Sequence, residues 1–120
     1  MPLKTQSTRW IFSARSWRVY DGDTITATVD LGFRVSIEIT GRLDGIDAPE
    51  VRGPERADGL VSRDWLRERL GTALEVKLET RSTPKRQRGK YGRWLIVLWA
   101  DGENINERLV AEGYAVARTY

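Results

Sequence analysis

Two neighbouring stretches of the sequence alternate between polar and apolar residues, and this alternation is the strongest constraint on the fold. In 24–30, "TITATVD", every second residue is apolar, and the same holds in 34–40, "RVSIEIT". A period of two is typical of strands that bury one face, and the Leu-Gly pair at 31–32 is a turn signal. We therefore expect two antiparallel strands joined by a tight turn.

The residues after this pair predict a third strand and then a helix. Gly41 interrupts the alternation as a β-bulge does, and the third strand is expected to continue through Arg42 and Leu43. Residues 55–70, "ERADGLVSRDWLRERL", lack strand alternation and predict a helix. Its buried stripe would consist of Ala57, Val61, Trp65, Leu66 and Leu70.

The second half of the chain predicts two further strands and a second helix. Residues 74–80 alternate, whereas 93–100, "RWLIVLWA", is a nearly continuous apolar run, as expected for a strand buried on both faces. Residues 104–113 open on a capping-box pattern and close on glycine, which predicts a short helix, with a last short strand at 114–118. This order indicates an α+β fold, mainly β, built as a five-stranded OB-fold-type β-barrel with two helices.

Length and composition indicate a single soluble domain. The chain has 120 residues, of which 40% are apolar and 31% are charged. No apolar run approaches the roughly 18 residues of a membrane-spanning helix. The N-terminal residues also hold no apolar stretch long enough for a secretory signal. We therefore expect the chain as given to be a cytoplasmic monomer that does not bind membranes.

Two residue types are absent, and their absence excludes much enzyme chemistry. Without cysteine there is no disulfide, no thiol nucleophile and no Cys-ligated zinc. Without histidine there is no imidazole base, no Ser-His-Asp triad and no His-ligated metal. Catalysis by this chain must therefore use carboxylates, lysine, arginine, tyrosine or a hard metal ion.

The net charge of +3 is unevenly distributed along the chain. Residues 1–20 carry four basic side chains and no acid, and residues 81–93, "RSTPKRQRGKYGR", carry six and no acid. Such a concentration suits a polyanion such as nucleic acid, although a solvated basic loop has the same composition. We expect 1–18 to form a basic N-terminal segment and 19–120 to form the barrel domain.

Five short motifs together resemble the staphylococcal nuclease (thermonuclease-like) family. They are "DGDT" at 21–24, the arginine at 42, "DAPE" at 47–50, "KYGR" at 90–93 and "NERLVAEGYA" at 106–115. Each motif alone is weak, since an Asp-Gly pair is usually a hairpin turn. All five occur in the family's order, from about Val19 to about Ala117.

The resemblance implies a Ca²⁺ site. The residues matching Asp23 and Asp47 hold the ion in the family, together with the backbone carbonyl of the residue matching Ala48. Asp21 matches an acid close to the metal. Carboxylate and carbonyl oxygens are the ligands that Ca²⁺ prefers.

The resemblance also implies the residues that act on a phosphodiester. Glu50 matches the glutamate that positions or deprotonates the attacking water, and Arg42 and Arg93 match two arginines that bind the scissile phosphate. A planar guanidinium suits two phosphate oxygens at once. Lys90 and Tyr91 match residues that meet a terminal phosphate. Lys85, Arg86 and Arg88 are the further basic residues expected to follow the nucleic-acid backbone.

The implied function is a Ca²⁺-dependent endonuclease that hydrolyses DNA, and RNA as a further substrate, with little sequence preference. Two alternatives remain open from the sequence. One is a catalytically silent nucleic-acid-binding module of the same fold. The other is a protein-interaction barrel, which the basic segment at 81–93 disfavours. The loop after Glu50 is much shorter than in the founding nuclease, and the chain stops before that protein's third helix.

Overall fold

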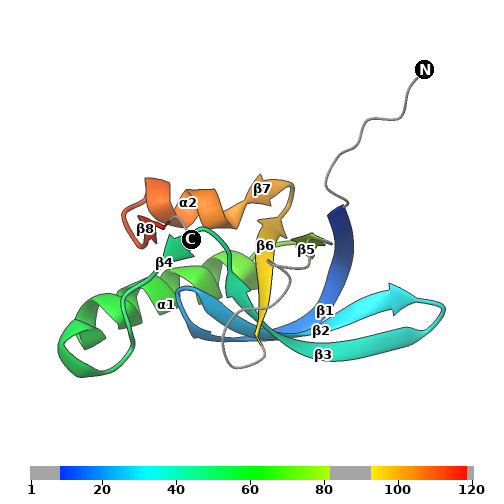
Figure 1. The fold of residues 1–120 in the computed structure, drawn as a ribbon, viewed down its shortest axis with the longest axis horizontal. Helices are drawn as coiled ribbons and strands as arrows, with labels where there is room; N and C mark the ends of the chain where they lie inside the picture. The colour runs from blue at the N-terminus through cyan, green and yellow to red at the C-terminus, as the bar shows by residue number, and fades with distance from the viewer. Residues whose placement is uncertain (1–8, 82–92, 119–120) are drawn as a thin grey trace, which may run out of the picture.

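The barrel is built from five strands that close on themselves. The structure is a computed structural model, and it describes residues 9–81 and 93–118. The strands lie in the order β3-β2-β1-β5-β6, and a parallel pairing of β3 with β6 closes the ring (Figure 1). The predicted OB-fold-type α+β architecture is confirmed. The strands are β1 (Arg9–Asp21), β2 (Thr24–Gly32), β3 (Val35–Leu43), β5 (Val76–Arg81) and β6 (Trp94–Ala100).

The two predicted helices and three short strands complete the fold. Asn104 caps α2 by accepting a hydrogen bond from the Glu107 amide at 3.0 Å, as the sequence predicts. In the part of the chain that the structure describes, neither helix is long and apolar enough to cross a membrane. The remaining elements are β4 (Ile46–Asp47), the 3₁₀ turn η1 (Gly53–Glu55), α1 (Arg56–Gly71), β7 (Glu103–Asn104), α2 (Ile105–Ala111) and β8 (Val116–Ala117).

Strand β1 was not expected from the sequence. It pairs with β5 through its first half and with β2 through its second half. A register shift between Ala14 and Ser16 breaks the alternation, so that the apolar residues before and after it do not share one period of two. The predicted boundary after residue 18 falls inside this strand.

Gly41 does not form the predicted bulge. Strand β3 runs through it without a register shift, so the two strands expected on either side of Gly41 are one. A Cβ atom at this position would lie 2.5 Å from Cδ1 of Ile96. The Ile96 side chain of β6 therefore fills the space beside Gly41, where the pairing of β3 with β6 closes the barrel.

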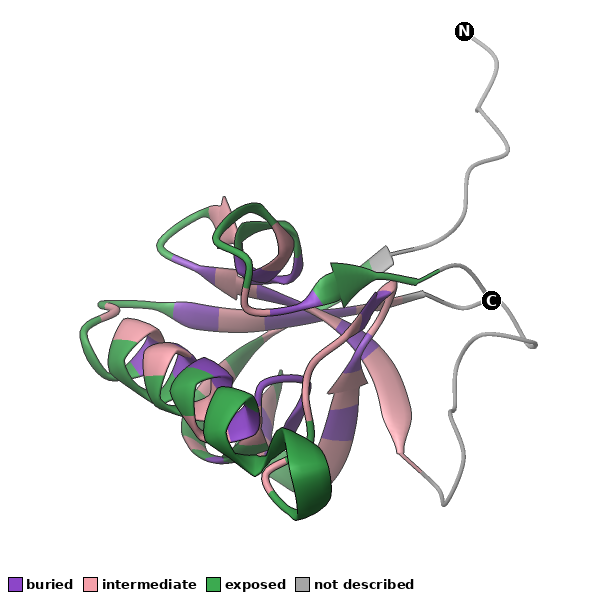
Figure 2. Cartoon of the chain, turned by 90° about the vertical axis from the view of Figure 1, so that its left-hand side faces the viewer, coloured by how far each residue is buried: buried purple, intermediate pink, exposed green. Residues whose placement is uncertain are grey.

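The buried face of α1 agrees in part with the one expected. Leu66 and Leu70 are buried and Trp65 is partly buried against the core, as predicted, but Ala57 and Val61 are exposed. The rest of the buried face is small and consists of Gly59 and Ser62. Figure 2 shows the buried positions of α1 on the side turned towards the strands. At Gly59 and Ser62 the buried face is therefore set by how closely neighbouring segments approach the helix, and not by large apolar side chains.

The sequence predicted that β6 is buried on both faces, but the structure buries one face more than the other. Ile96, Leu98 and Ala100 are buried in the barrel, while Leu95, Val97 and Trp99 between them are half-buried. The short helix α2 packs on β6, and the outer face of the strand keeps some exposure. The barrel interior is the hydrophobic core, and it continues onto Leu66 and Leu70 of α1 and onto Ile105 and Leu109 of α2.

Glu103 connects the two helices. Its carboxylate accepts hydrogen bonds from Arg69 of α1 at 3.2 Å and from Arg108 of α2. Partial desolvation raises the pKa of the Glu103 carboxyl, but the bonds from the two arginines outweigh it, so the net pKa is lowered. Ionised Glu103 therefore links α1 to α2 through one arginine from each helix.

Candidate functional site

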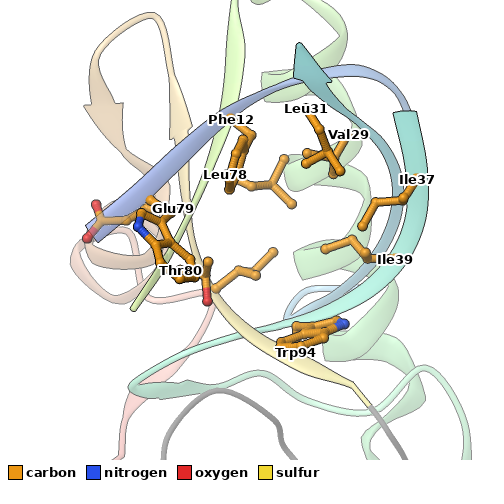
Figure 3. A pocket seen from close by; sticks show the side chains of 11 residues that line it. Phe12, Val29, Leu31, Ile37, Ile39, Leu78, Glu79, Thr80 and Trp94 are labelled. Carbon is orange, nitrogen blue, oxygen red and sulfur yellow. The ribbon is translucent and has the colours of Figure 1, made fainter. Parts of the chain in front are cut away.

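An apolar cavity in the barrel lies apart from the place where the described site residues gather. A cavity of about 250 Å³ lies inside the mouth of the barrel, and apolar side chains from β1, β2, β3, β5 and β6 point into it (Figure 3). Among the described residues, none of those expected to bind metal or phosphate lines it. The acidic and basic residues meet instead around the β1–β2 turn and the end of β3.

Asp23 is fixed in the tight turn between β1 and β2. Its side chain is 8% exposed, and both of its oxygens accept hydrogen bonds. Oδ1 accepts from the Thr24 hydroxyl at 3.0 Å, and Oδ2 accepts from the Ala48 amide at 2.9 Å. A Cβ atom at Gly22 would lie 2.8 Å from Cβ of Ala48. The Asp-Gly-Asp turn therefore packs directly against the segment that carries Ala48.

Asp21 lies beside Asp23 at the end of β1. Its Oδ1 accepts a hydrogen bond from the Asp23 amide at 3.0 Å. Burial, followed by the side-chain interaction with Asp23 and its negative charge, raises the pKa of Asp21 to about 7. Asp21 thus contacts the turn that holds Asp23, which is the position expected of an acid next to the site rather than at its centre.

Arg42 brings the two predicted metal-binding aspartates together. Its Nη2 donates to Asp47 Oδ1 at 3.1 Å and approaches Asp23 Oδ2 at 3.5 Å. Its Nη1 donates to the backbone carbonyls of Leu43 at 3.3 Å and Ile46 at 3.1 Å. The Arg42 side chain is only 13% exposed. Two carboxylates from distant segments therefore converge on one cationic nitrogen.

Asp47 reaches the site from the short strand β4, which pairs with β8. Its second oxygen, Oδ2, accepts a hydrogen bond from Nη1 of Arg118 at 3.0 Å. The Arg118 amide also donates to the carbonyl of Gly45 at 2.8 Å. Arg118 carries no sequence signal, because 71 positions separate it from Asp47 and β8 is only two residues long.

Glu50 lies on the segment after Ala48, with its side chain exposed. Among the described residues, no hydrogen bond joins its carboxylate to Arg42 or to the aspartates. Its backbone is held against α1 instead, where a Cβ atom at Gly59 would lie 2.0 Å from the Glu50 carbonyl oxygen. Gly59 therefore decides how closely the Glu50 segment approaches the helix, and the motif comparison does not reveal it.

The other predicted phosphate-binding residues are only partly described. Arg93 is half-buried and directly precedes β6, whose parallel pairing with β3 begins at Gly41 and Trp94. Arg42 and Arg93 therefore come from adjacent strands at the same end of the barrel. The predicted residues Lys85, Arg86, Arg88, Lys90 and Tyr91 lie outside the described residues.

The donor set of this cluster fits a hard cation with few protein ligands. Within residues 9–81 and 93–118, no group of three or more carboxylates is arranged to hold a metal ion. The expected set is smaller, consisting of Asp23, Asp47 and the carbonyl of Ala48. Asp23 Oδ2 and Asp47 Oδ1 both face the Arg42 guanidinium, so a positive charge already lies where these oxygens converge. Oxygen-only ligands of this kind suit Ca²⁺.

Comparison with known proteins agrees with the motifs and the geometry. A family model described as staphylococcal nuclease homologue matches residues 40–120. The chain belongs to the staphylococcal nuclease family. Two relatives named thermonuclease, from Staphylococcus hyicus and Staphylococcus intermedius, are each 35% identical over 106 residues, which is 86% of this chain. The SPbeta prophage-derived endonuclease YokF of Bacillus subtilis (strain 168) is 32% identical over 104 residues, also 86% of this chain.

The chain spans only part of the length of those relatives. The matched region covers 57% and 58% of the two thermonucleases and 33% of the YokF endonuclease. The chain thus spans little more than half the length of the thermonucleases. It nevertheless brings together Asp23, Arg42 and Asp47 around one point.

Proposed function

We propose that this domain is a Ca²⁺-dependent nuclease that hydrolyses phosphodiester bonds in DNA, and also in RNA, with little sequence preference. The observation that carries the proposal is the convergence of Asp23 and Asp47 on the Arg42 guanidinium. A phosphodiester is negatively charged and repels nucleophiles, and positive charge held near it lowers this barrier. Similarity to proteins named thermonuclease and endonuclease supports the same reading.

Asp23, Asp47 and the Ala48 carbonyl would hold the cation. When bound, the ion would stabilise the charge that develops on the phosphate oxygens. With only two carboxylates among its ligands, the site should bind Ca²⁺ weakly, with a Kd of about 10⁻⁴–10⁻³ M. Mg²⁺ requires a tighter octahedral shell and should support the reaction poorly.

The arginines and Glu50 would act on the substrate. Arg42 and Arg93 are placed on adjacent strands, where their guanidinium groups can bind the oxygens of one phosphate. Glu50 is an exposed carboxylate two residues after Ala48, and it would orient water and take its proton. With no histidine in the chain, a carboxylate is the suitable base near neutral pH.

The substrate class follows from the charge distribution. Residues 81–93 carry six basic side chains and no acid, and they join the ends of β5 and β6. A segment of this charge favours a polyanionic chain over a small phosphate ester. Contacts to the sugar-phosphate backbone carry no sequence information, so little sequence preference is expected.

The proposal can be tested by gel assay. The protein is incubated with single-stranded DNA or RNA in Ca²⁺, in Mg²⁺ or in excess chelator. Cleavage should occur in Ca²⁺ and stop in chelator. Glu50→Gln should lower kcat by about 10²–10⁴-fold, the range typical of a positioned acid–base group.

The matched control for that variant is Glu55→Gln. Glu55 is also exposed and lies on the same stretch of chain, so this variant should retain wild-type activity. Undiminished cleavage in chelator would refute the metal-dependent mechanism. Binding to nucleic acid without cleavage in any cation would identify a catalytically silent binding module instead.

A further inference from the structure

Both oxygens of the Asp47 carboxylate are engaged by guanidinium groups. Oδ1 accepts from Arg42 Nη2 at 3.1 Å, and Oδ2 accepts from Arg118 Nη1 at 3.0 Å. Of the two aspartates expected to bind the cation, Asp47 is the more accessible, with its side chain 40% exposed compared with 8% for Asp23. A cation that binds to Asp47 must therefore displace one of these guanidinium groups or share the carboxylate with it.

The two arginines are not equally easy to displace. Arg42 is 13% exposed and donates to two backbone carbonyls as well as to the aspartates. Moving it would leave buried acceptors without a donor, which is costly. The Arg118 side chain is 54% exposed, and exposed ion pairs contribute only about 0–1 kcal/mol. Arg118 is therefore the group that yields when a cation arrives.

We propose that Arg118 competes with the metal cation for Asp47 and so lowers the cation affinity of the site. This inference rests on the proposed function, because it assumes that Asp47 is a cation ligand. The effect is electrostatic. Even after the direct contact with Asp47 is broken, the Arg118 backbone stays tied to Gly45, so its charge remains near the bound cation. Arg118 thereby sets the cation concentration at which the site fills.

The expected change in the Kd for Ca²⁺ follows from the repulsion between one positive charge and a divalent cation a few ångströms apart. Water and salt screen most of this repulsion, which leaves an effect on Kd of about 3- to 10-fold. Removal of the charge at position 118 should therefore strengthen Ca²⁺ binding by that factor. Removal of a residue that only held Asp47 in place would weaken it. The sign of the change separates the two roles.

The test is a Ca²⁺ titration of the whole protein by NMR at constant ionic strength, without substrate. The reporter is the backbone amide of Ala48, which donates to Asp23 Oδ2 at 2.9 Å. Arg118→Gln should bind Ca²⁺ about 3- to 10-fold more tightly than the wild type, and Arg118→Lys should stay within about twofold of it.

The matched control is Arg15→Gln. Arg15 also forms an exposed ion pair, with Asp30 at 3.3 Å, and its side chain is 57% exposed, but it lies outside the cluster. This variant loses the same net charge as Arg118→Gln. Because the lost charge lies outside the cluster and is screened by salt, the Ca²⁺ affinity should stay within about twofold of the wild type. An equal gain in Arg15→Gln would assign the effect to net charge and overturn the proposal.

The remaining outcomes distinguish this inference from the proposed function. If the wild type binds Ca²⁺ and Arg118→Gln binds equally or more weakly, the competition is refuted while the cation site stands. If Arg118→Gln binds Ca²⁺ and the wild type does not, the competition is supported, because Arg118 then keeps the cation out of the site altogether. If neither protein binds Ca²⁺, both the cation site and the competition fail.

Discussion

Gly59 is the position where the site is most sensitive to one added methyl group. In Gly59→Ala, the new Cβ atom would lie 2.0 Å from the Glu50 carbonyl oxygen, 2.4 Å from its carbon and 2.9 Å from the Val51 amide nitrogen. Ordinary contacts of a Cβ atom begin at 3.4 Å. All three neighbours are backbone atoms, so no side chain can rotate away. The segment that carries Glu50 must therefore move from α1 by more than one ångström.

Two opposing effects set the stability of Gly59→Ala. Alanine favours the helix by about 1 kcal/mol over glycine. Overpacking against fixed backbone costs about 1–3 kcal/mol and sometimes more. Because the contact is so short, we expect overpacking to dominate, with a net loss of about 1–3 kcal/mol in the free energy of unfolding. Displacement of a catalytic group by about 1 Å should also lower kcat by about 10²-fold.

The measurement is urea unfolding, compared with the same substitution elsewhere in α1. Gly59→Ala should lower the midpoint by about 1 M, given slopes of about 1–3 kcal/mol per M for small proteins. Gly71→Ala is the control, since nothing lies within 4 Å of the Cβ position at the last residue of α1. That variant should gain about 0.5–1 kcal/mol. A Gly59→Ala protein at least as stable as the wild type, with unchanged Glu50 and Val51 amide shifts, would refute the reasoning.

Three further predictions concern packing, pH and salt. Asn106→Ala should lose about 2–4 kcal/mol in chemical unfolding, because the buried amide accepts from one backbone amide and donates to two backbone carbonyls; a loss below that of an exposed substitution would contradict this. Glu103→Gln should lower the melting temperature at pH 7. The difference should begin to shrink near pH 4.5, the usual pKa of a glutamate, and should be lost once the pH falls through the lower pKa of the folded state. A pH-independent difference would rule out this linkage. Replacement of Lys85, Arg86 and Arg88 with glutamine should raise KM and flatten the salt dependence of nucleic-acid binding while leaving kcat nearly unchanged. An unchanged salt slope in that triple variant would mean that these residues form a solvated loop.

The barrel was predictable because most of its strands keep a clean period of two. The alternation in 24–30 and 34–40 gave β2 and β3, and the capping pattern before Glu107 gave α2. Strand β1 was not predictable in the same way. Its register shift after Ala14 divides one long strand into two short patterns of opposite phase.

The buried face of α1 and the role of Gly41 depend on contacts between segments far apart in the chain, which local sequence patterns do not predict. Gly59 is buried because the Glu50 backbone lies against it, and Ser62 because its hydroxyl donates to the Tyr114 carbonyl. Neither residue is apolar and large, so a search for an apolar stripe passes over both. Gly41 interrupts the alternation as a bulge would, but a glycine is needed there because the Ile96 side chain fills the space beside it.

The sequence predicted that Asp23, Arg42 and Asp47 come together, but it did not predict how they contact one another. The motif order placed Asp23, Arg42 and Asp47 in one site, and the structure brings these three into contact. The expectation that Arg42 binds phosphate did not reveal that it also bridges the two aspartates. Arg118 could not be found from sequence, because its approach to Asp47 depends on the pairing of β4 with β8.

The parallel pairing that closes the barrel also has a consequence for chain synthesis. Gly41 and Leu43 find their partners only when Trp94 and Ile96 have been made, after α1 and β5. At about 5–20 residues per second, translation leaves the edge of β3 without its partner for several seconds. An unpaired edge strand is a template for pairing with other chains. The yield of folded protein should therefore depend on how well the ribosome and chaperones shield β3 during that interval.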